Sequence, residues 1–139
     1  MSLKALMSKI ITSLPARATA LDAAKFMTEM SVGSVIVVEG NKPVGIVTDR
    51  DIMTKVIIEG RNPQTVSIRD IMASPVITIS VEKSIFDVTK LMKKYQVRRF
   101  PVVDAEGKIV GVITLSDILI FIGQEMKNIA SALKVRLGK

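Results

Sequence analysis

Two stretches of the sequence repeat one short pattern of residues able to bind a ligand. Each has a glycine, two apolar residues, a threonine, two variable residues and an aspartate, in residues 45–51 and 111–117. The chemistry that these types offer is hydrogen bonding, because a carboxylate in the first turn of a helix can accept both hydrogens of a vicinal diol. Asp51 and Asp117 are therefore candidate diol-binding residues, although an aspartate near a helix start also caps the helix.

The threonine and the glycine of the pattern allow two interpretations each. The hydroxyls of Thr48 and Thr114, with the free N–H groups of a helix start, suit a phosphate or ribose oxygen, and they suit helix capping equally well. Gly45 and Gly111 let the backbone come close to a ligand or to a neighbouring part of the protein. The sequence leaves both pairs of alternatives open.

The composition excludes several classes of function. The 139 residues include no cysteine and no histidine, so disulfides, thiolate metal sites and the usual catalytic triads are absent. Charged residues make up 24% and apolar residues 48%, which is typical of a globular protein. No apolar stretch is long enough to span a bilayer, and the pattern of the N-terminus is not that of a signal peptide. We therefore expect a cytoplasmic protein that is not an enzyme and has no metal site.

The net charge of +7 is spread along the whole chain. No run of basic residues exceeds two, and there is no tryptophan and only one tyrosine. A nucleic-acid-binding protein usually clusters its basic side chains, so we treat nucleic-acid binding only as an accessory function. A basic surface that attracts small anions such as phosphates remains the second interpretation of the charge.

An internal repeat covers most of the sequence. Residues 21–38 match residues 86–103 at an offset of 65, with six of 18 positions identical, and residues 44–52 match 110–118 at an offset of 66. The chain thus contains two copies of one unit, divided as residues 1–62 and 63–139. Neither copy is large enough to be comfortably stable alone, which predicts that the two pack into one module.

Each copy reads as strand, helix, strand, strand and helix. The first strands are expected at residues 10–12 and 76–79, and the helices that follow begin at the caps Thr19 and Ser84. Hairpins with turns at 40–43 and 105–108 come next. The closing helices are expected over 49–59 and from about 116 almost to 137. The fold class is α/β (α+β), with two tandem βαββα units.

The doubled unit resembles a tandem pair of CBS (cystathionine beta-synthase) domains, a stand-alone Bateman module. The resemblance rests on the repeated glycine–threonine–aspartate pattern, on residues 98–104 and on the leaders 6–7 and 70–72. It implies two units packed sheet to sheet around a pseudo-twofold axis. It also implies clefts for an adenosine-containing ligand, namely AMP, ADP, ATP or S-adenosylmethionine, with no obligatory cofactor. Such modules are regulatory, commonly form homodimers, and pass a conformational change to a partner protein.

The resemblance also implies roles for particular residues. Asp51 and Asp117 would hold ribose hydroxyls, and Arg98 and Arg99 would contact phosphates through charge-assisted hydrogen bonds. Adenine would lie between residues of the first strands and of the segments preceding the hairpins. The candidates for that contact are Thr12, Leu14, Thr78, Ile79, Val97 and Pro101.

The two copies differ at positions that matter for a ligand. Gly33-Ser34 stands where the second copy has Arg98-Arg99, and Asp49-Arg50 stands where it has Leu115-Ser116. The clefts are therefore not equivalent, and if only one binds ligand we favour the cleft that contains Asp117. The alternative function is a protein interaction or dimerisation module with degenerate ligand sites, motivated by an apolar stripe in the C-terminal segment 118–137.

Overall fold

The structure, a computed structural model, describes the backbone of residues 2–137. The first unit contains α1 (Leu3–Leu6), β1 (Ser13–Leu14), α2 (Ala20–Met30), β2 (Ser34–Glu39), β3 (Lys42–Thr48), α3 (Asp49–Ile52) and the π-helical turn η1 (Met53–Ile57). The second contains the 3-10 turn η2 (Ile68–Asp70), β4 (Ile79–Ser80), α4 (Ile85–Tyr95), β5 (Arg99–Val103), β6 (Ile109–Thr114) and α5 (Leu115–Leu137). This order confirms the predicted pair of βαββα units.

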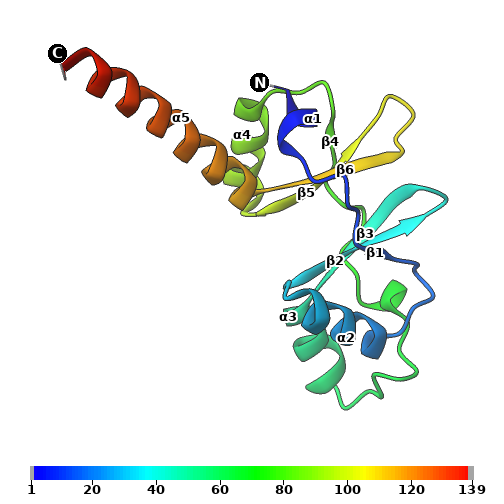
Figure 1. The fold of residues 1–139 in the computed structure, drawn as a ribbon. Helices are drawn as coiled ribbons and strands as arrows, with labels where there is room; N and C mark the ends of the chain where they lie inside the picture. Colours follow the sequence, from blue (N-terminus) through cyan, green and yellow to red (C-terminus); the bar gives the residue numbers. More distant parts are fainter. Residues whose placement is uncertain (1, 138–139) are drawn as a thin grey trace.

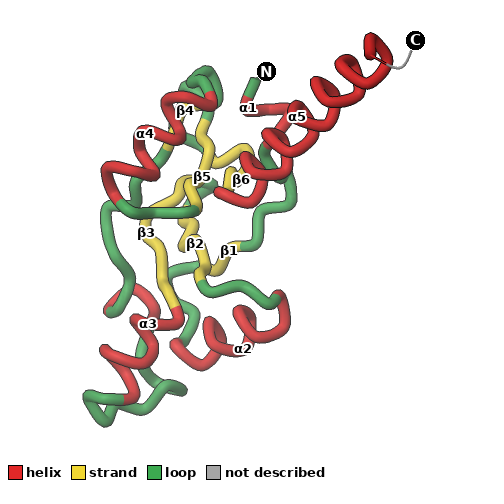
Figure 2. The backbone as a smooth tube through the Cα atoms, turned by 90° about the vertical axis from the view of Figure 1, so that its left-hand side faces the viewer, coloured by secondary structure: helices red, strands yellow, loops and turns green. Residues whose placement is uncertain are grey.

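The two units have the same sheet topology. The sheets run β1-β2-β3 and β4-β5-β6, each with one parallel and one antiparallel pairing. Figures 1 and 2 show the strands in the middle of the molecule, with α2 and α3 at one end and α1, α4 and α5 at the other. Both sheets therefore lie where the units meet.

The first strand of each unit differs from the prediction. The apolar runs at 10–12 and 76–78 are not strands, and pairing is limited to β1 and β4, at residues 13–14 and 79–80. The reason is topological, because Ser8 pairs with Val112 of the second unit before Ser13 pairs with Ile36 of the first. The residues between Ser8 and Ser13 connect the second unit's sheet to the first unit's sheet.

The leader segment that precedes each unit in the sequence packs on the other unit. Leu3 and Met7 are buried in the second core, with Phe100 and Ile113, whereas Ile68 and Ile71 are buried in the first. The backbone of Ser8 exchanges two hydrogen bonds with Val112, and Ala73 exchanges two with Ile46. The boundary at 62/63 describes the sequence repeat, whereas this crosswise packing ties the units together.

The long helix of each unit begins at the predicted cap. The Asp22 carboxylate accepts a hydrogen bond from the Thr19 backbone N–H at 2.9 Å, and Asp87 accepts one from Ser84 at 3.0 Å. The two hydroxyls accept hydrogen bonds from the aspartate N–H groups in return. The bond from the backbone N–H of the capping residue, and after it the interaction of the carboxylate with the hydroxyl, hold the pKa of Asp22 and Asp87 below the ordinary value of 3.8.

The closing helices differ in length between the units. The first ends after η1, with Gly60 at a φ of 68° beyond it, while α5 extends over 23 residues. Figure 1 shows its C-terminal part projecting away from the body of the protein. Its apolar side chains from position 119 onward are largely exposed, namely Leu119, Ile120, Ile122, Met126, Ile129 and Leu133.

Candidate functional site

A cavity of about 730 Å³ lies between the two units, near the starts of β2 and β5 and the ends of β3 and β6. Its lining comes from both units: Gly33, Ser34, Ile46, Thr48, residues 96–99, residues 114–116 and Leu119. Five residues selected from the sequence meet here, which are Thr48, Val97, Arg98, Arg99 and Thr114. The cavity thus combines both threonines of the repeated pattern with the arginine pair.

Several other predicted residues do not line this cavity, and they include both aspartates of the repeated pattern, Asp51 and Asp117. Leu14 borders a depression beside α2, and Thr78 and Ile79 border one beside α4. Pro101 is buried within β5, and Thr12 lies on the segment that crosses between units. A role for these residues in contacting adenine stays a prediction.

The glycines of the pattern lie beneath the crossing leaders. A Cβ added to Gly111 would lie 2.6 Å from the Met7 Sδ and 2.9 Å from the Ser8 carbonyl oxygen. A Cβ on Gly45 would meet the Met72 side chain and lie 3.1 Å from the Ala73 oxygen. Only glycine leaves room for a leader at either place, so the contacts favour packing over ligand approach.

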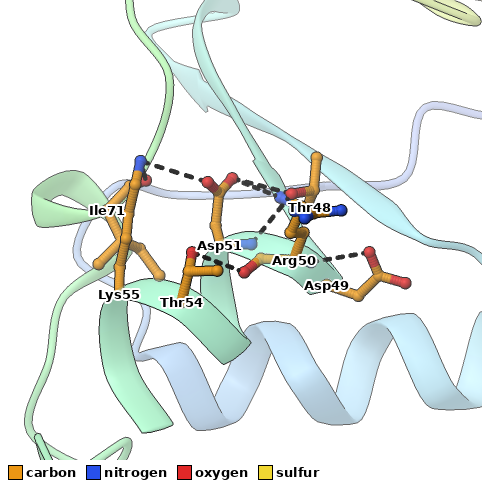
Figure 3. A network of polar contacts seen from close by, with 7 residues as sticks. All are labelled: Thr48, Asp49, Arg50, Asp51, Thr54, Lys55 and Ile71. Carbon is orange, nitrogen blue, oxygen red and sulfur yellow. Dashed lines mark hydrogen bonds and ion pairs between the residues drawn. The ribbon is translucent and has the colours of Figure 1, made fainter. Parts of the chain in front are cut away.

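In the first unit, both oxygens of the Asp51 carboxylate have partners within the chain (Figure 3). Oδ2 accepts hydrogen bonds from the Thr48 backbone N–H at 2.9 Å and from the Thr48 hydroxyl at 3.1 Å. Oδ1 forms an ion pair with Lys55 Nζ at 3.2 Å, and the same ammonium group donates to the Ile71 carbonyl oxygen at 2.9 Å. Asp51 therefore caps α3 and anchors a lysine.

In the second unit, the equivalent carboxylate has one hydrogen bond. Asp117 Oδ2 accepts from the Thr114 backbone N–H at 2.9 Å, and the Asp117 N–H donates to the Thr114 hydroxyl oxygen at 3.2 Å. Within the part of the chain whose side chains are described, no cation pairs with Asp117, and Phe121 occupies the position that corresponds to Lys55. The capping interpretation of Asp51 and Asp117 is confirmed, and it leaves Asp117 Oδ1 available.

The arginine pair makes the second unit's side of the cavity basic. The Arg98 carbonyl accepts from the Leu115 N–H at 2.9 Å, just as the Gly33 carbonyl accepts from the Asp49 N–H at 3.0 Å. The first unit has Asp49 where the second has Leu115. The Asp49 Oδ2 atom lies 3.4 Å from the position that a Cβ on Gly33 would take. Neither Arg98 nor Arg99 forms an ion pair with a described carboxylate. The charge in the cavity therefore favours an anion on the side of the arginines.

Sequence reasoning missed some residues of the site. Ile46, Gln96 and Leu119 line the cavity because they flank the selected positions along the strand and helix ends. Lys55 was also missed, although its spacing of four residues from Asp51 on a helix is a recognised signal for an ion pair. Comparison of Lys55 with Phe121 across the repeat reveals the difference.

The comparisons with known proteins agree with this architecture. The family model described as "CBS domain" matches residues 3–58 and 68–124. The chain belongs to the CBS domain family. It contains two CBS units, whose matched residues include both glycine–threonine–aspartate patterns.

Individual relatives extend the comparison. The chain is 43% identical over 111 residues to protein MK0525 of Methanopyrus kandleri, covering 79% of this chain and 56% of that protein. It thus spans little more than half of that relative. The CBS domain pair of protein MJ0100, solved in complex with 5′-methylthioadenosine and S-adenosyl-L-methionine, has a TM-score of 0.77 and 28% identity, covering 90% of this chain and 98% of that one.

A second solved structure covers nearly the whole chain. A hexameric CBS-CP12 protein from bloom-forming cyanobacteria has a TM-score of 0.71 and 28% identity, covering 98% of this chain and 87% of its own.

The residues that the structure describes contain no cluster of three or more acidic, cysteine or histidine residues arranged for a metal ion. Across the same residues, no helix has the length and apolar character needed to cross a membrane.

Proposed function

We propose that this CBS pair is a regulatory module that binds one adenosine-containing ligand in the cavity between its units. The observation that carries the proposal is the placement of Arg98, Arg99 and Thr114 around one cavity, with Asp117 following the lining residue Ser116 in the first turn of α5. The ribose diol would donate to the Asp117 carboxylate, and the anionic part of the ligand would lie against the arginines.

Hydrogen-bond geometry supports the role of Asp117. An ionised carboxylate has about four acceptor positions on its two oxygens, and the Thr114 N–H occupies one of them. Hydrogen bonds to an ionised acceptor are shorter and stronger than bonds between neutral groups. A diol bound here would therefore be held without disturbing the cap of α5.

The ligand class is proposed from the site and from the neighbours together. The MJ0100 pair was solved with S-adenosyl-L-methionine and 5′-methylthioadenosine, which both carry adenosine. The arginine pair adds a preference for a phosphorylated member of this class, such as AMP, ADP or ATP. We propose no catalytic step for this chain, which would act by transmitting the bound state to a partner protein. The cytoplasmic location stays a prediction.

Calorimetric titration tests this function directly. The nucleotide-stripped protein is titrated with AMP, ADP, ATP and S-adenosylmethionine, and the melting temperature is recorded with each. The proposal expects saturable binding of at least one ligand and a raised melting temperature, because a ligand that binds only the folded state stabilises it. Absence of binding by all four would contradict it and would leave the module as a protein interaction domain.

A second proposal, self-association, rests on the exposed apolar side of α5. Met126 and Ile129 are 65% and 62% exposed, whereas helices in proteins owe most of their stability to the packing of an amphipathic face. The hexameric assembly of the CBS-CP12 neighbour supports a second copy as the occupant. We propose a homodimer as the smallest assembly. Truncation after Gly123 should lower the number of chains per particle measured by light scattering, and a truncated protein that is still dimeric would contradict this role of α5.

A further inference from the structure

We infer that Lys55 occupies the Asp51 carboxylate and so prevents it from binding a ribose. The pair then holds one adenosine-containing ligand per chain, at Asp117. This inference rests on the proposed function and names the residue that decides which unit is used. The two units share a backbone and a capping scheme, and they differ in what surrounds the aspartate.

The number of acceptor positions distinguishes the two carboxylates. Asp51 accepts from the Thr48 N–H, the Thr48 hydroxyl and Lys55 Nζ, which uses three of about four positions. A vicinal diol needs two. Asp117 uses one position, for the Thr114 N–H, and has room for both hydroxyls.

The position of the lysine places it in direct competition with a ligand hydroxyl. Lys55 Nζ bridges Asp51 Oδ1 and the Ile71 carbonyl oxygen, and the Asp51 side chain is only 18% exposed (Figure 3). A ligand hydroxyl would have to replace a charge-assisted contact by a neutral donor. It would also remove one of the two acceptors that hold Lys55 between Asp51 and the leader segment that carries Ile71 and covers Gly45.

The neighbourhood of the first carboxylate adds to this effect. Gly33 and Ser34 offer no cation where the second unit has its arginines, and Asp49 adds a negative charge beside Gly33. A phosphorylated ligand would meet repulsion there instead of attraction. The lysine and the local charge thus act in the same direction.

The test counts bound ligand in variants of Lys55. Wild-type protein, Lys55→Met and Lys55→Arg are titrated by calorimetry with AMP and, separately, with S-adenosylmethionine. Methionine keeps an unbranched side chain that is one atom shorter and removes its charge, whereas arginine keeps the charge. We expect one equivalent of either ligand per chain for the wild type and for Lys55→Arg, and a second equivalent of S-adenosylmethionine for Lys55→Met, because Asp49 still repels AMP. Adding Asp51→Asn to Lys55→Met should remove that second equivalent, and circular dichroism checks the fold of every variant.

The outcomes separate this inference from the proposed function. Two equivalents in the wild type, or one equivalent of S-adenosylmethionine in folded Lys55→Met, would overturn the role of Lys55 and leave the adenosine-binding function standing. One equivalent that is lost in Asp51→Asn and kept in Asp117→Asn would also overturn it. Absence of binding by every variant would reject the proposed function, and the inference with it.

Discussion

The first and second units of this CBS pair have the same sheets and the same capped helices, yet their polar groups are used differently. In the first unit, the Thr48 hydroxyl and Lys55 complete the hydrogen bonding of Asp51 inside the protein. In the second, Asp117 keeps most of its acceptor capacity, and Arg98 and Arg99 have no carboxylate partner among the described residues. The difference teaches that one scaffold can satisfy the aspartate within the chain in one unit and leave most of its acceptor positions unused in the other.

The apolar parts of the two units, by contrast, are nearly symmetric. Met7 lies over Gly111 and Met72 lies over Gly45, and each leader adds a two-bond bridge to the other unit's sheet. The duplication thus keeps the contacts that join the units while the cavity-lining residues differ. The predictions that follow test this contrast.

Replacing the Asp117 carboxylate by an amide should have the largest effect on ligand affinity. Asp117→Asn retains an oxygen that can cap α5 but loses the charge that a diol would meet. Loss of a hydrogen bond to a charged group costs about 1.5–3 kcal/mol, so the affinity for AMP should fall about ten- to a hundredfold. Asp22→Asn is the matched control, because it changes the same type of capping box on α2. Equal affinity of Asp117→Asn and wild type would contradict the assignment.

Alanine at Gly45 and at Gly111 should reveal how similar the two contacts between a leader and a sheet are. Gly111→Ala forces a Cβ against the buried Met7 and the Ser8 backbone, whereas Gly45→Ala meets mainly the partly buried, flexible Met72. Overpacking costs about 1–3 kcal/mol, so both variants should unfold at lower urea concentrations, Gly111→Ala more so. The reverse order would show that the leaders are held differently from this structure.

The arginine pair should affect phosphorylated ligands selectively. Replacing Arg98 and Arg99 together by alanine should weaken AMP about fivefold, which is about 1 kcal/mol for partly exposed charges. Binding of 5′-methylthioadenosine, which has no phosphate, should stay within twofold. Increasing salt should weaken AMP binding to the wild type more than to the variant. Equal losses for the two ligands would show that the arginines only shape the cavity.

The smallest effect concerns acid stability, where the units should behave alike. The lowered pKa of Asp22 and Asp87 stabilises the folded state above the unfolded value near 3.8, and this contribution disappears as the pH falls through the folded pKa. Asp22→Asn and Asp87→Asn should each make the free energy of unfolding less dependent on pH below about 4. A pH dependence identical to that of the wild type would contradict the capping contribution.

Much of this architecture was predictable from the sequence, because repetition reports on both units at once. The caps at Thr19 and Ser84 and the two hairpins follow from local side-chain chemistry, and the structure confirms them. The crossing leaders were not predictable, because an apolar run such as residues 10–12 has no local signal for the unit to which it belongs. The short β1 is a consequence of that crossing.

The site was predictable in part. The arginines, the threonines and Val97 reach one cavity because they end or begin strands that meet between the units. The candidates Leu14, Thr78 and Ile79 do not line it, since their positions depend on where the crossing segments join the sheets. The state of each aspartate depends on a residue four positions later, which only the comparison of Lys55 with Phe121 brings out.

A crystal structure grown with AMP or S-adenosylmethionine at saturating concentration tests the central claim most directly. We predict one ligand per chain, with its ribose hydroxyls within hydrogen-bonding distance of the Asp117 carboxylate. The Asp51 carboxylate should remain paired with Lys55 and without a ribose. A ribose on Asp51, or a ligand bound away from both aspartates, would contradict the account.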